Sequence, residues 1–203
     1  PLFRGLRALT KRIVVDTALA GDAAAGLVAL DRMLSRQPHP YLWDLAWLRD
    51  APWREMAARL FDAPERAAAL ERLEAIEIVG GSIGEAALMA GWIGVQLGYT
   101  VPEHARCLRT AAGADVSFAH HRESTQDAVR SIRLRTDVLT FSASLEGKGG
   151  VCLSVESPKE QRSRCEPLMA RTLDVLVREA LYGLGADPAF PQALTLAARL
   201  AAG

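Results

Sequence analysis

The chain has 203 residues and a mass of 21.9 kDa, enough for one substantial core or for two small lobes that share an interface. Apolar residues make up 50% of the chain and charged residues 24%, which excludes an intrinsically disordered protein. The 24 basic and 24 acidic residues give a net charge of zero, so no overall field attracts nucleic acid or an anionic membrane.

The sequence contains no segment that predicts a membrane or a secretory route. No apolar run approaches the roughly 18 residues needed to span a bilayer, and no signal-peptide pattern opens the chain. Its three cysteines do not suggest the disulfide framework of a small secreted protein. We therefore expect a cytoplasmic protein with neither a nucleic-acid nor a membrane partner. A strand-like segment follows Pro1 almost at once, which favours a piece of a longer protein.

The first 100 residues predict an α/β lobe. Residues 11–16 form a β-branched run typical of a buried strand, and leucines at helical spacing predict a helix over 22–34. Two prolines end that helix. The segment 41–62 predicts one or two helical turns and then a second helix, which Asp50-Ala51-Pro52 opens.

A strand, a glycine turn and a capped helix complete this lobe. Residues 74–79 predict the strand, and Gly80-Gly81 ends it. Ser82 and Glu85 have the spacing of a capping box in front of an apolar helix over 86–97. The order of these elements indicates a βαβ-like arrangement over residues 1–100.

Periodicity disappears between residues 101 and 129, which predicts a loop or a linker. The remaining part, 130–203, begins with alternating residues over 131–145. A glycine-rich turn and a second alternating run over 151–155 then predict a β-hairpin.

Two helices are predicted to follow the hairpin. Apolar residues at helical spacing predict the first over 157–181, and Asp187-Pro188 opens the second. The predicted fold class is therefore α/β, with a mixed sheet, a βαβ-like first part, and a C-terminal β-hairpin plus helices.

The turn at Gly81 and Ser82 lies where a nucleotide-binding loop would lie, because helix N-termini bind phosphate. However, it lacks the GxGxxG spacing, and no lysine follows the second glycine as in a P-loop. The simpler interpretation is an ordinary strand-to-helix turn. The alternative is a sugar-phosphate or nucleotide-binding site that Gly81 and Ser82 form with Arg133 and Arg135.

The sequence contains no recognisable catalytic or metal-ligating constellation. The four histidines show neither HxxxH nor HExxH spacing, and no Ser/His/Asp or Cys/His arrangement can be assembled. We expect no enzyme activity, no metal and no cofactor. Cys152 falls in the return strand of the hairpin and Cys165 early in the predicted helix after it. Buried, inert thiols are the expectation for both, and a redox-active pair is the alternative.

The most unusual stretch, between Tyr41 and Asp62, holds three of the four tryptophans. Aromatic residues at helical spacing normally pack in a core. Tryptophans interspersed with arginines are also typical of interface hot spots, so both interpretations stay open. In the second, Arg54 points away from Trp53 towards solvent or a carboxylate. The candidate partner-binding residues are Trp43, Asp44, Trp47, Arg49, Trp53 and Arg54.

The run YLWDLAWLRDAPWRE, from Tyr41 to Glu55, resembles the central motif of the OpcA family, the glucose-6-phosphate dehydrogenase assembly proteins. The positions that fall on the motif are Trp47, Arg49, Pro52, Trp53, Arg54 and Glu55. Further segments that resemble the family are 12–16, 61–62, 90–92, 97–98, 133–135, 179–181, 187–188 and 193–194. The resemblance covers most of the chain outside 102–129, and the amino-terminal part of the family is missing.

This resemblance implies a protein without catalytic activity or cofactor. It implies that the partner is glucose-6-phosphate dehydrogenase, and that the chain promotes the active oligomer of that enzyme and activates it allosterically. The process would be the oxidative pentose phosphate pathway. For photosynthetic relatives, the resemblance also implies a link between this role and the redox state of thiols.

Overall fold

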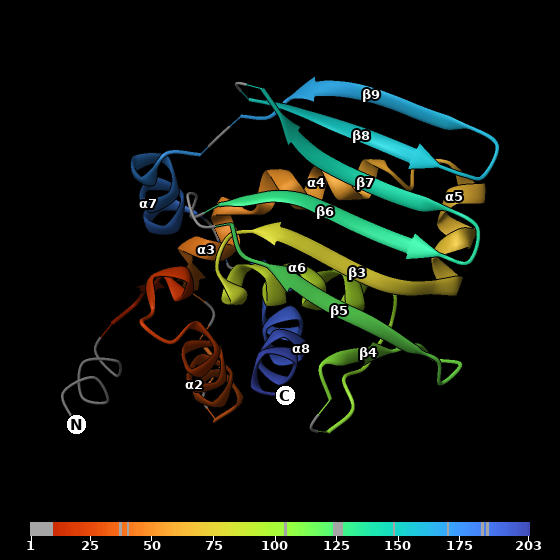
Figure 1. The fold of residues 1–203 in the computed structure, drawn as a ribbon. Helices are drawn as coiled ribbons and strands as arrows, with labels where there is room; N and C mark the ends of the chain where they lie inside the picture. Colours follow the sequence, from red (N-terminus) through yellow and green to blue (C-terminus); the bar gives the residue numbers. More distant parts are fainter. Residues whose placement is uncertain are drawn as a thin grey trace.

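The computed structural model describes residues 10–36, 38–39, 41–103, 105–123, 128–147, 149–169, 171–183, 185 and 187–203. Pro1, His104 and Lys148 of the hairpin turn lie outside these residues. Figure 1 shows the described chain as a large twisted sheet with helices on one of its faces. None of the described helices is both long enough and apolar enough to cross a membrane.

A small βαβ unit opens the described chain. Strand β1 (Ile13–Val15) pairs in parallel with β2 (Leu42–Asp44), and helix α2 (Ala23–Arg36) connects them after the short 3-10 helix η1 (Thr17–Leu19). The predicted strand and helix are confirmed, whereas the helical turn expected at Trp43 is wrong. Strand β2 extends to Asp44 because this residue caps the next helix, and a capping residue takes extended backbone angles.

The segment that holds the tryptophans continues through three short helices. These are α3 (Leu45–Arg49), α4 (Ala51–Arg59) and α5 (Pro64–Ala69), followed by the 3-10 helix η2 (Leu70–Arg72). Helix α4 begins directly after Asp50 with a proline in its first turn, as the sequence predicts.

The next strand forms the centre of the large sheet. Strand β3 (Leu73–Gly80) leads into helix α6 (Ile83–Gln96), and the chain then returns to the sheet as β4 (Cys107–Arg109) and β5 (Asp115–His121). The loop predicted over 101–129 is therefore wrong. Strand β5 pairs in parallel with β3, so this stretch completes a second βαβ unit within the sheet.

The last strands form an antiparallel meander, and two helices end the chain. The elements are β6 (Val129–Thr136), β7 (Thr140–Glu146), β8 (Gly150–Glu156), β9 (Gln161–Pro167), α7 (Leu173–Tyr182) and α8 (Phe190–Ala202). Two corrections apply, since 131–145 contains two strands around a turn, and 161–167 is a strand in place of the predicted helix. The sheet order is β4-β5-β3-β6-β7-β8-β9, so both predicted parts of the chain contribute to one mixed sheet.

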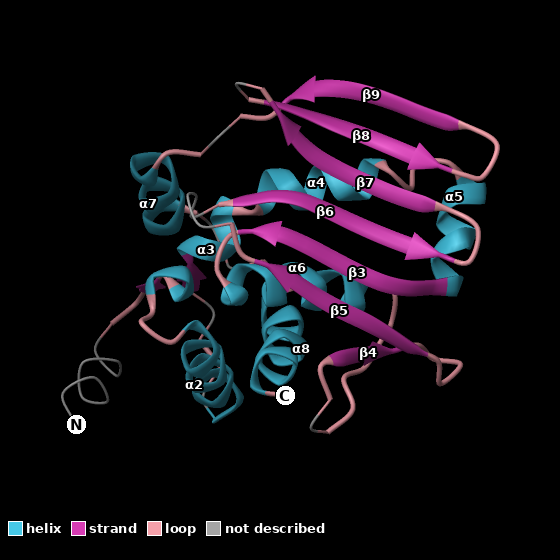
Figure 2. Cartoon of the chain, viewed as in Figure 1, coloured by secondary structure: helices cyan, strands magenta, loops and turns pink. Residues whose placement is uncertain are grey.

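The layers are unequal on the two faces of this sheet. Helices α4, α5 and α6 pack on one face, with α8 behind α6, while no described helix covers the other (Figure 2). The covered face holds the largest core cluster, which includes Ile76, Ile132 and Phe141, each fully buried. Helices α6 and α8 approach so closely at Gly91 that a Cβ there would lie 2.4 Å from the carbonyl oxygen of Ala193.

Candidate functional site

The six residues predicted to bind a partner lie together on β2, α3 and α4, and five of them are buried. The exposed fractions are 7% for Trp43, 3% for Trp47 and 5% for Trp53. Asp44 and Arg54 are buried as well, at 1% and 8%. Of the two directions expected for Arg54, towards solvent or towards a carboxylate, the first is therefore wrong. We refer to the segment Trp43–Arg54 and the charged groups that contact it as the buried network.

Asp44 connects η1 to helix α3. Its carboxylate accepts hydrogen bonds from the backbone N–H of Ala46 at 3.0 Å and of Thr17 at 3.1 Å, and from the Thr17 hydroxyl at 2.6 Å. Burial raises the pKa of Asp44 to about 6, although these three hydrogen bonds favour the ionised form and lower it. Asp44 thus serves as a helix cap whose charge is costly to bury.

Arg49 bridges two carboxylates from different parts of the chain. One guanidinium nitrogen lies 2.8 Å from Oε1 of Glu85, and the other lies 2.7 Å from Oδ2 of Asp16. Burial opposes the charge of Arg49, but the hydrogen bonds to Asp16 and Glu85 outweigh this and raise its pKa. Glu85 is completely buried, so Arg49 supplies the positive charge that this carboxylate needs.

Arg54 stacks on the indole of Trp47. Its guanidinium carbon lies 3.6 Å from the ring centroid, and it donates a hydrogen bond of 2.8 Å to the Trp47 carbonyl oxygen. Burial lowers the pKa of Arg54 to about 10. The Trp47 indole N–H donates to Asp187 at 3.1 Å, and Asp187 in turn accepts a bond from the backbone N–H of Ala189. The stacked pair thereby holds the beginning of α8.

Asp50 is the least satisfied group of the buried network. It is 3% exposed, and its Oδ2 atom has no hydrogen-bond partner among the described residues. Burial and the charge of Glu85 raise the pKa of Asp50 well above its ordinary value, against the opposing effects of Arg54 and Arg49. The indole nitrogen of Trp43 is also buried without a partner in the described chain.

The buried network connects the adjacent helices α3 and α4 to η1, α6 and α8, which come from distant parts of the sequence. Its charged groups are mostly enclosed and paired with one another, so they offer no open surface for a substrate or a partner. What this arrangement can do is fix the relative positions of the helices on the covered side of the sheet. Most side chains of the segment that the sequence singled out are thus buried, and they contact one another inside the fold.

The predicted anion site is not assembled. Ser82 caps α6 in a capping box, in which Glu85 accepts from the Ser82 backbone N–H at 2.9 Å and the Ser82 Oγ accepts from the Glu85 N–H at 3.2 Å. The polar groups at Ser82, beside Gly81, are therefore already bound to a carboxylate. Arg133 and Arg135 lie on the uncovered face of the sheet, 3.5 Å from Glu77 and 3.4 Å from Glu74, whereas α6 packs on the other face.

A cluster of arginines that sequence analysis missed lies at the other end of the sheet. A hollow of about 130 Å³ between α4, α5 and the strands β8 and β9 is lined by four arginines. Its apolar walls come from Leu60, Leu153 and Val155. The lining arginines are Arg59, Arg66, Arg162 and Arg164. In the sequence, Arg162 and Arg164 alternate with a serine and a cysteine, which is a pattern typical of a strand. This pattern falls within the segment predicted to be a helix.

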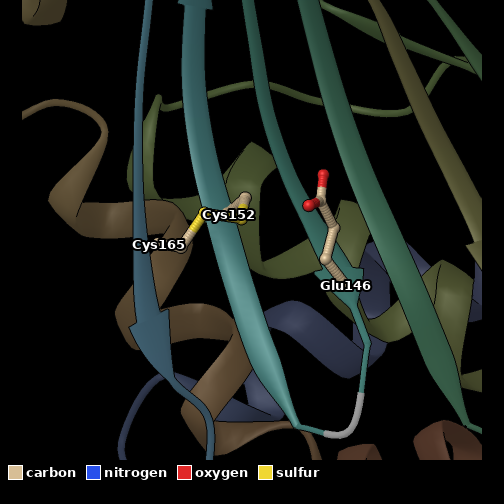
Figure 3. A group of neighbouring side chains, drawn as sticks. All are labelled: Glu146, Cys152 and Cys165. Atoms are coloured by element: carbon tan, nitrogen blue, oxygen red, sulfur yellow. A yellow bond between two sulfur atoms is a disulfide. The ribbon is translucent and has the colours of Figure 1, made fainter.

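Cys152 and Cys165 form a disulfide between β8 and β9, so the prediction of inert thiols is wrong. The two residues face each other directly in the strand register, because Cys165 lies in β9. Figure 3 shows both with Glu146 at the end of β7. Among the described residues, these three make up the one group of three or more His, Cys, Asp or Glu side chains close enough to hold a metal ion.

The comparisons with known proteins place this fold in a family. Residues 40–194 match the family described as the C-terminal domain of the glucose-6-phosphate dehydrogenase subunit. The chain belongs to this family, the OpcA family. The match includes the whole buried network except the residues before Pro40, and it confirms the resemblance noted in the sequence.

Two cyanobacterial OpcA proteins, both described as OxPP cycle proteins, are among the similar sequences. The protein of Synechocystis sp. is 31% identical over 101 residues, which cover 49% of this chain and 21% of that protein. The protein of Nostoc punctiforme is 31% identical over 98 residues, 47% of this chain and 21% of its own length. The chain thus matches about a fifth of these OpcA relatives.

Solved structures share the fold at low sequence identity. KijD10, a 3-ketoreductase from Actinomadura kijaniata, superposes with a TM-score of 0.58 at 12% identity, covering 98% of this chain and 70% of that one. The transcriptional regulator Gal80p from Kluyveromyces lactis gives 0.52 at 13% identity, with 95% and 64% covered. An enzyme and a regulator have this fold in common with the OpcA chain, so the fold alone does not decide between catalysis and regulation.

Proposed function

We propose that this chain is part of a non-catalytic assembly factor and allosteric activator of glucose-6-phosphate dehydrogenase in the oxidative pentose phosphate pathway. The observation that carries the proposal is the match of residues 40–194 to a domain described as belonging to a subunit of that enzyme. The enclosed network around Trp47 supports it, since enclosed and paired charges suit a scaffold for a binding surface. The setting that fits this partner is the cytoplasm.

The surface that we propose for the partner consists of the exposed apolar residues of α7 and those beside it. Met169 is 83% exposed, Leu173 63% and Tyr182 77%, and Leu181 adds a half-exposed side chain. Large apolar side chains that stay exposed on and beside one short helix are typical of protein interfaces. Because this chain has no net charge, local apolar contacts have to supply the affinity.

The buried network would act on the partner indirectly, through α7. Leu176 and Ala180 of α7 pack against Trp43 and Leu48 in a separate core cluster. In addition, Arg171 donates a hydrogen bond of 3.0 Å to the Leu48 carbonyl oxygen. The predicted partner-binding residues thereby position the surface that touches the dehydrogenase, without touching it themselves.

The experiment is co-purification with the glucose-6-phosphate dehydrogenase of the same organism, followed by kinetics with and without this chain. We expect a complex and an increase in dehydrogenase activity. The pure chain should turn over no glucose 6-phosphate. Failure to bind, or turnover that a point mutation in this chain abolishes, would contradict the proposal.

A double variant tests the surface on α7. Leu173→Ser with Tyr182→Ser should weaken binding by at least about tenfold, because apolar and aromatic anchors dominate interface energies. The melting temperature should stay unchanged, since both side chains are largely exposed. The matched control is Val138→Ser, which removes a 48% exposed apolar side chain from the β6–β7 turn at the opposite end of the sheet.

A second candidate function, binding of a small effector, is favoured by one observation. A hollow of about 570 Å³ between α2, residues 38–39 and 41–42, and the beginning of α8 has a mainly apolar lining, and this volume is typical of ligand pockets. Asp31 and Asp187 in its lining would repel phosphate groups, so a neutral or cationic ligand fits better than a sugar phosphate. Melting curves with glucose 6-phosphate or nicotinamide nucleotide, without the dehydrogenase, should therefore show no shift.

A further inference from the structure

Three side chains on adjacent strands converge on the uncovered face of the sheet. Cys152 alternates along β8 with Val151 and Leu153, which are buried in the core, so its sulfur lies on the other face. Cys165 is directly opposite on β9. On β7, Ser144 pairs with Cys152, and Glu146, two residues further, shares that face.

The geometry suits a metal ion. One ligand atom from each of Glu146, Cys152 and Cys165 lies within 4.8 Å of the other two. Around a tetrahedral Zn²⁺ with Zn–S bonds of about 2.3 Å, two sulfurs lie about 3.8 Å apart. Two reduced sulfurs in directly opposed strands, with Cα atoms 4.0 Å apart, can adopt this separation by side-chain rotation.

The carboxylate of Glu146 is available for this role. It forms no ion pair or hydrogen bond with any described residue, unlike Glu74 and Glu77 on the same face, which pair with arginines. Glu146 and Cys165 are both exposed, so an ion can reach the group directly from solvent.

The disulfide and a bound metal exclude each other, because a metal needs the free thiolates. We propose that Cys152, Cys165 and Glu146 form a site for a thiophilic divalent cation such as Zn²⁺ once a dithiol has reduced the disulfide. The dithiol transfers two electrons and two protons to the sulfurs and is itself oxidised to a disulfide. Binding of Zn²⁺ then releases the two thiol protons, and water completes a Cys₂Glu-water set.

The test measures metal binding by the chain in its two redox states. All samples carry Cys107→Ser, which removes the free cysteine on β4 at the far edge of the sheet. The chain is reduced with dithiothreitol, freed of reductant under anaerobic conditions and titrated with Zn²⁺ against a chromophoric chelator. We expect about one equivalent of Zn²⁺ per reduced chain and none for the oxidised chain. Titration with Co²⁺ should give thiolate-to-metal charge-transfer absorption.

Two variants identify the ligands. Glu146→Gln should weaken binding by at least about tenfold, because a carboxylate ligand is lost. Its matched control is Glu156→Gln, which changes a glutamate on the same face at the other end of β8 and should bind as the parent does. The double variant Cys152→Ser, Cys165→Ser, checked for folding by circular dichroism, should not bind. Equal Zn²⁺ binding by the reduced parent and the double variant, or unchanged binding by Glu146→Gln, would overturn the proposal.

Discussion

Arginine–carboxylate pairs of nearly equal length occur in two very different regions of this molecule. In the buried network, Arg49 lies 2.8 Å from Glu85, which is completely enclosed. At the edge strand β9, Arg162 lies 2.7 Å from Glu160, and both side chains are more than half exposed. This difference shows that the distance between two charged groups does not by itself measure how much the pair contributes to stability. Enclosure decides whether the loss of one partner leaves a charge that water cannot reach.

Arg49→Ala is expected to have the largest effect. It would leave the carboxylates of Glu85 and Asp16 without their cation, and breaking an enclosed pair in this way costs about 3–5 kcal/mol of unfolding free energy. Urea denaturation followed by circular dichroism measures the change. A loss below about 1 kcal/mol would show that this pair behaves like a surface pair. The contrast with the exposed pair of Arg162 and Glu160 would then disappear.

Asp44→Asn should change the pH dependence of stability. The pKa of Asp44 is about 6 in the folded chain and 3.8 as its ordinary value, so between these values the folded chain holds a proton that the unfolded chain has lost. The contribution of Asp44 to stability therefore falls as pH rises through this window, and the penalty for burying its charge is complete above it. The asparagine variant lacks this penalty.

Stability measured against urea at about pH 4 and pH 7 tests this. Relative to the parent, Asp44→Asn should gain up to roughly 3 kcal/mol between the two conditions. The amide can retain all three hydrogen bonds, because its oxygen can accept from the two backbone N–H groups and its nitrogen can donate to Thr17. A difference between variant and parent that does not vary with pH would contradict the burial of a charged Asp44.

Ser82→Ala tests the capping box beside the buried network. Loss of the N-cap hydroxyl should cost about 1 kcal/mol, since the Glu85 backbone N–H loses its acceptor. The control is Ser163→Ala on the edge strand β9, where no hydrogen bond is lost to a described residue and the midpoint of urea denaturation should not move. Equal effects of the two substitutions would argue against the cap.

Arg162→Ala should have the smallest effect of all. The pair with Glu160 is open to solvent, which screens it and competes for its hydrogen bonds. We expect the urea midpoint of the parent within experimental error, measured beside Arg49→Ala. A clear loss of stability would mean that the arginines around the hollow at β9 form a cooperative structure, which would narrow the contrast between the two regions.

Much of the fold follows from local sequence patterns, and the errors have physical causes. The capping box at Ser82 and the strand over 74–79 are local signals, and both are confirmed. The sequence does not predict strand β9, because the side chains that face the helices include Arg162 and Arg164. Apolar and polar residues therefore do not alternate along this strand. Strand β5 is also not predicted. The last of its side chains that face the helices is His120, which forms hydrogen bonds with backbone carbonyls and does not extend an apolar pattern.

The sequence singles out the segment of the candidate site but does not predict how its side chains are oriented. Three tryptophans and a PWRE motif identify the segment, whereas the stacking of Arg54 on Trp47 depends on where α8 and Asp187 come to lie. No local pattern distinguishes a guanidinium in solvent from one enclosed by residues that are more than a hundred positions away. The same holds for Cys152 and Cys165, whose pairing requires the register of β8 and β9.

The position of β3 has a consequence for biosynthesis. Both of its neighbours, β5 and β6, come later in the chain, so both edges of β3 stay open until β5 ends at residue 121, and one edge stays open until residue 136 has been made. During that interval Ile76 and Ile78 can be covered by α4 and α6, but at least one backbone edge of β3 has no native partner. A nascent chain that pauses before β6 therefore presents an apolar strand with an open edge, which favours aggregation and recognition by chaperones.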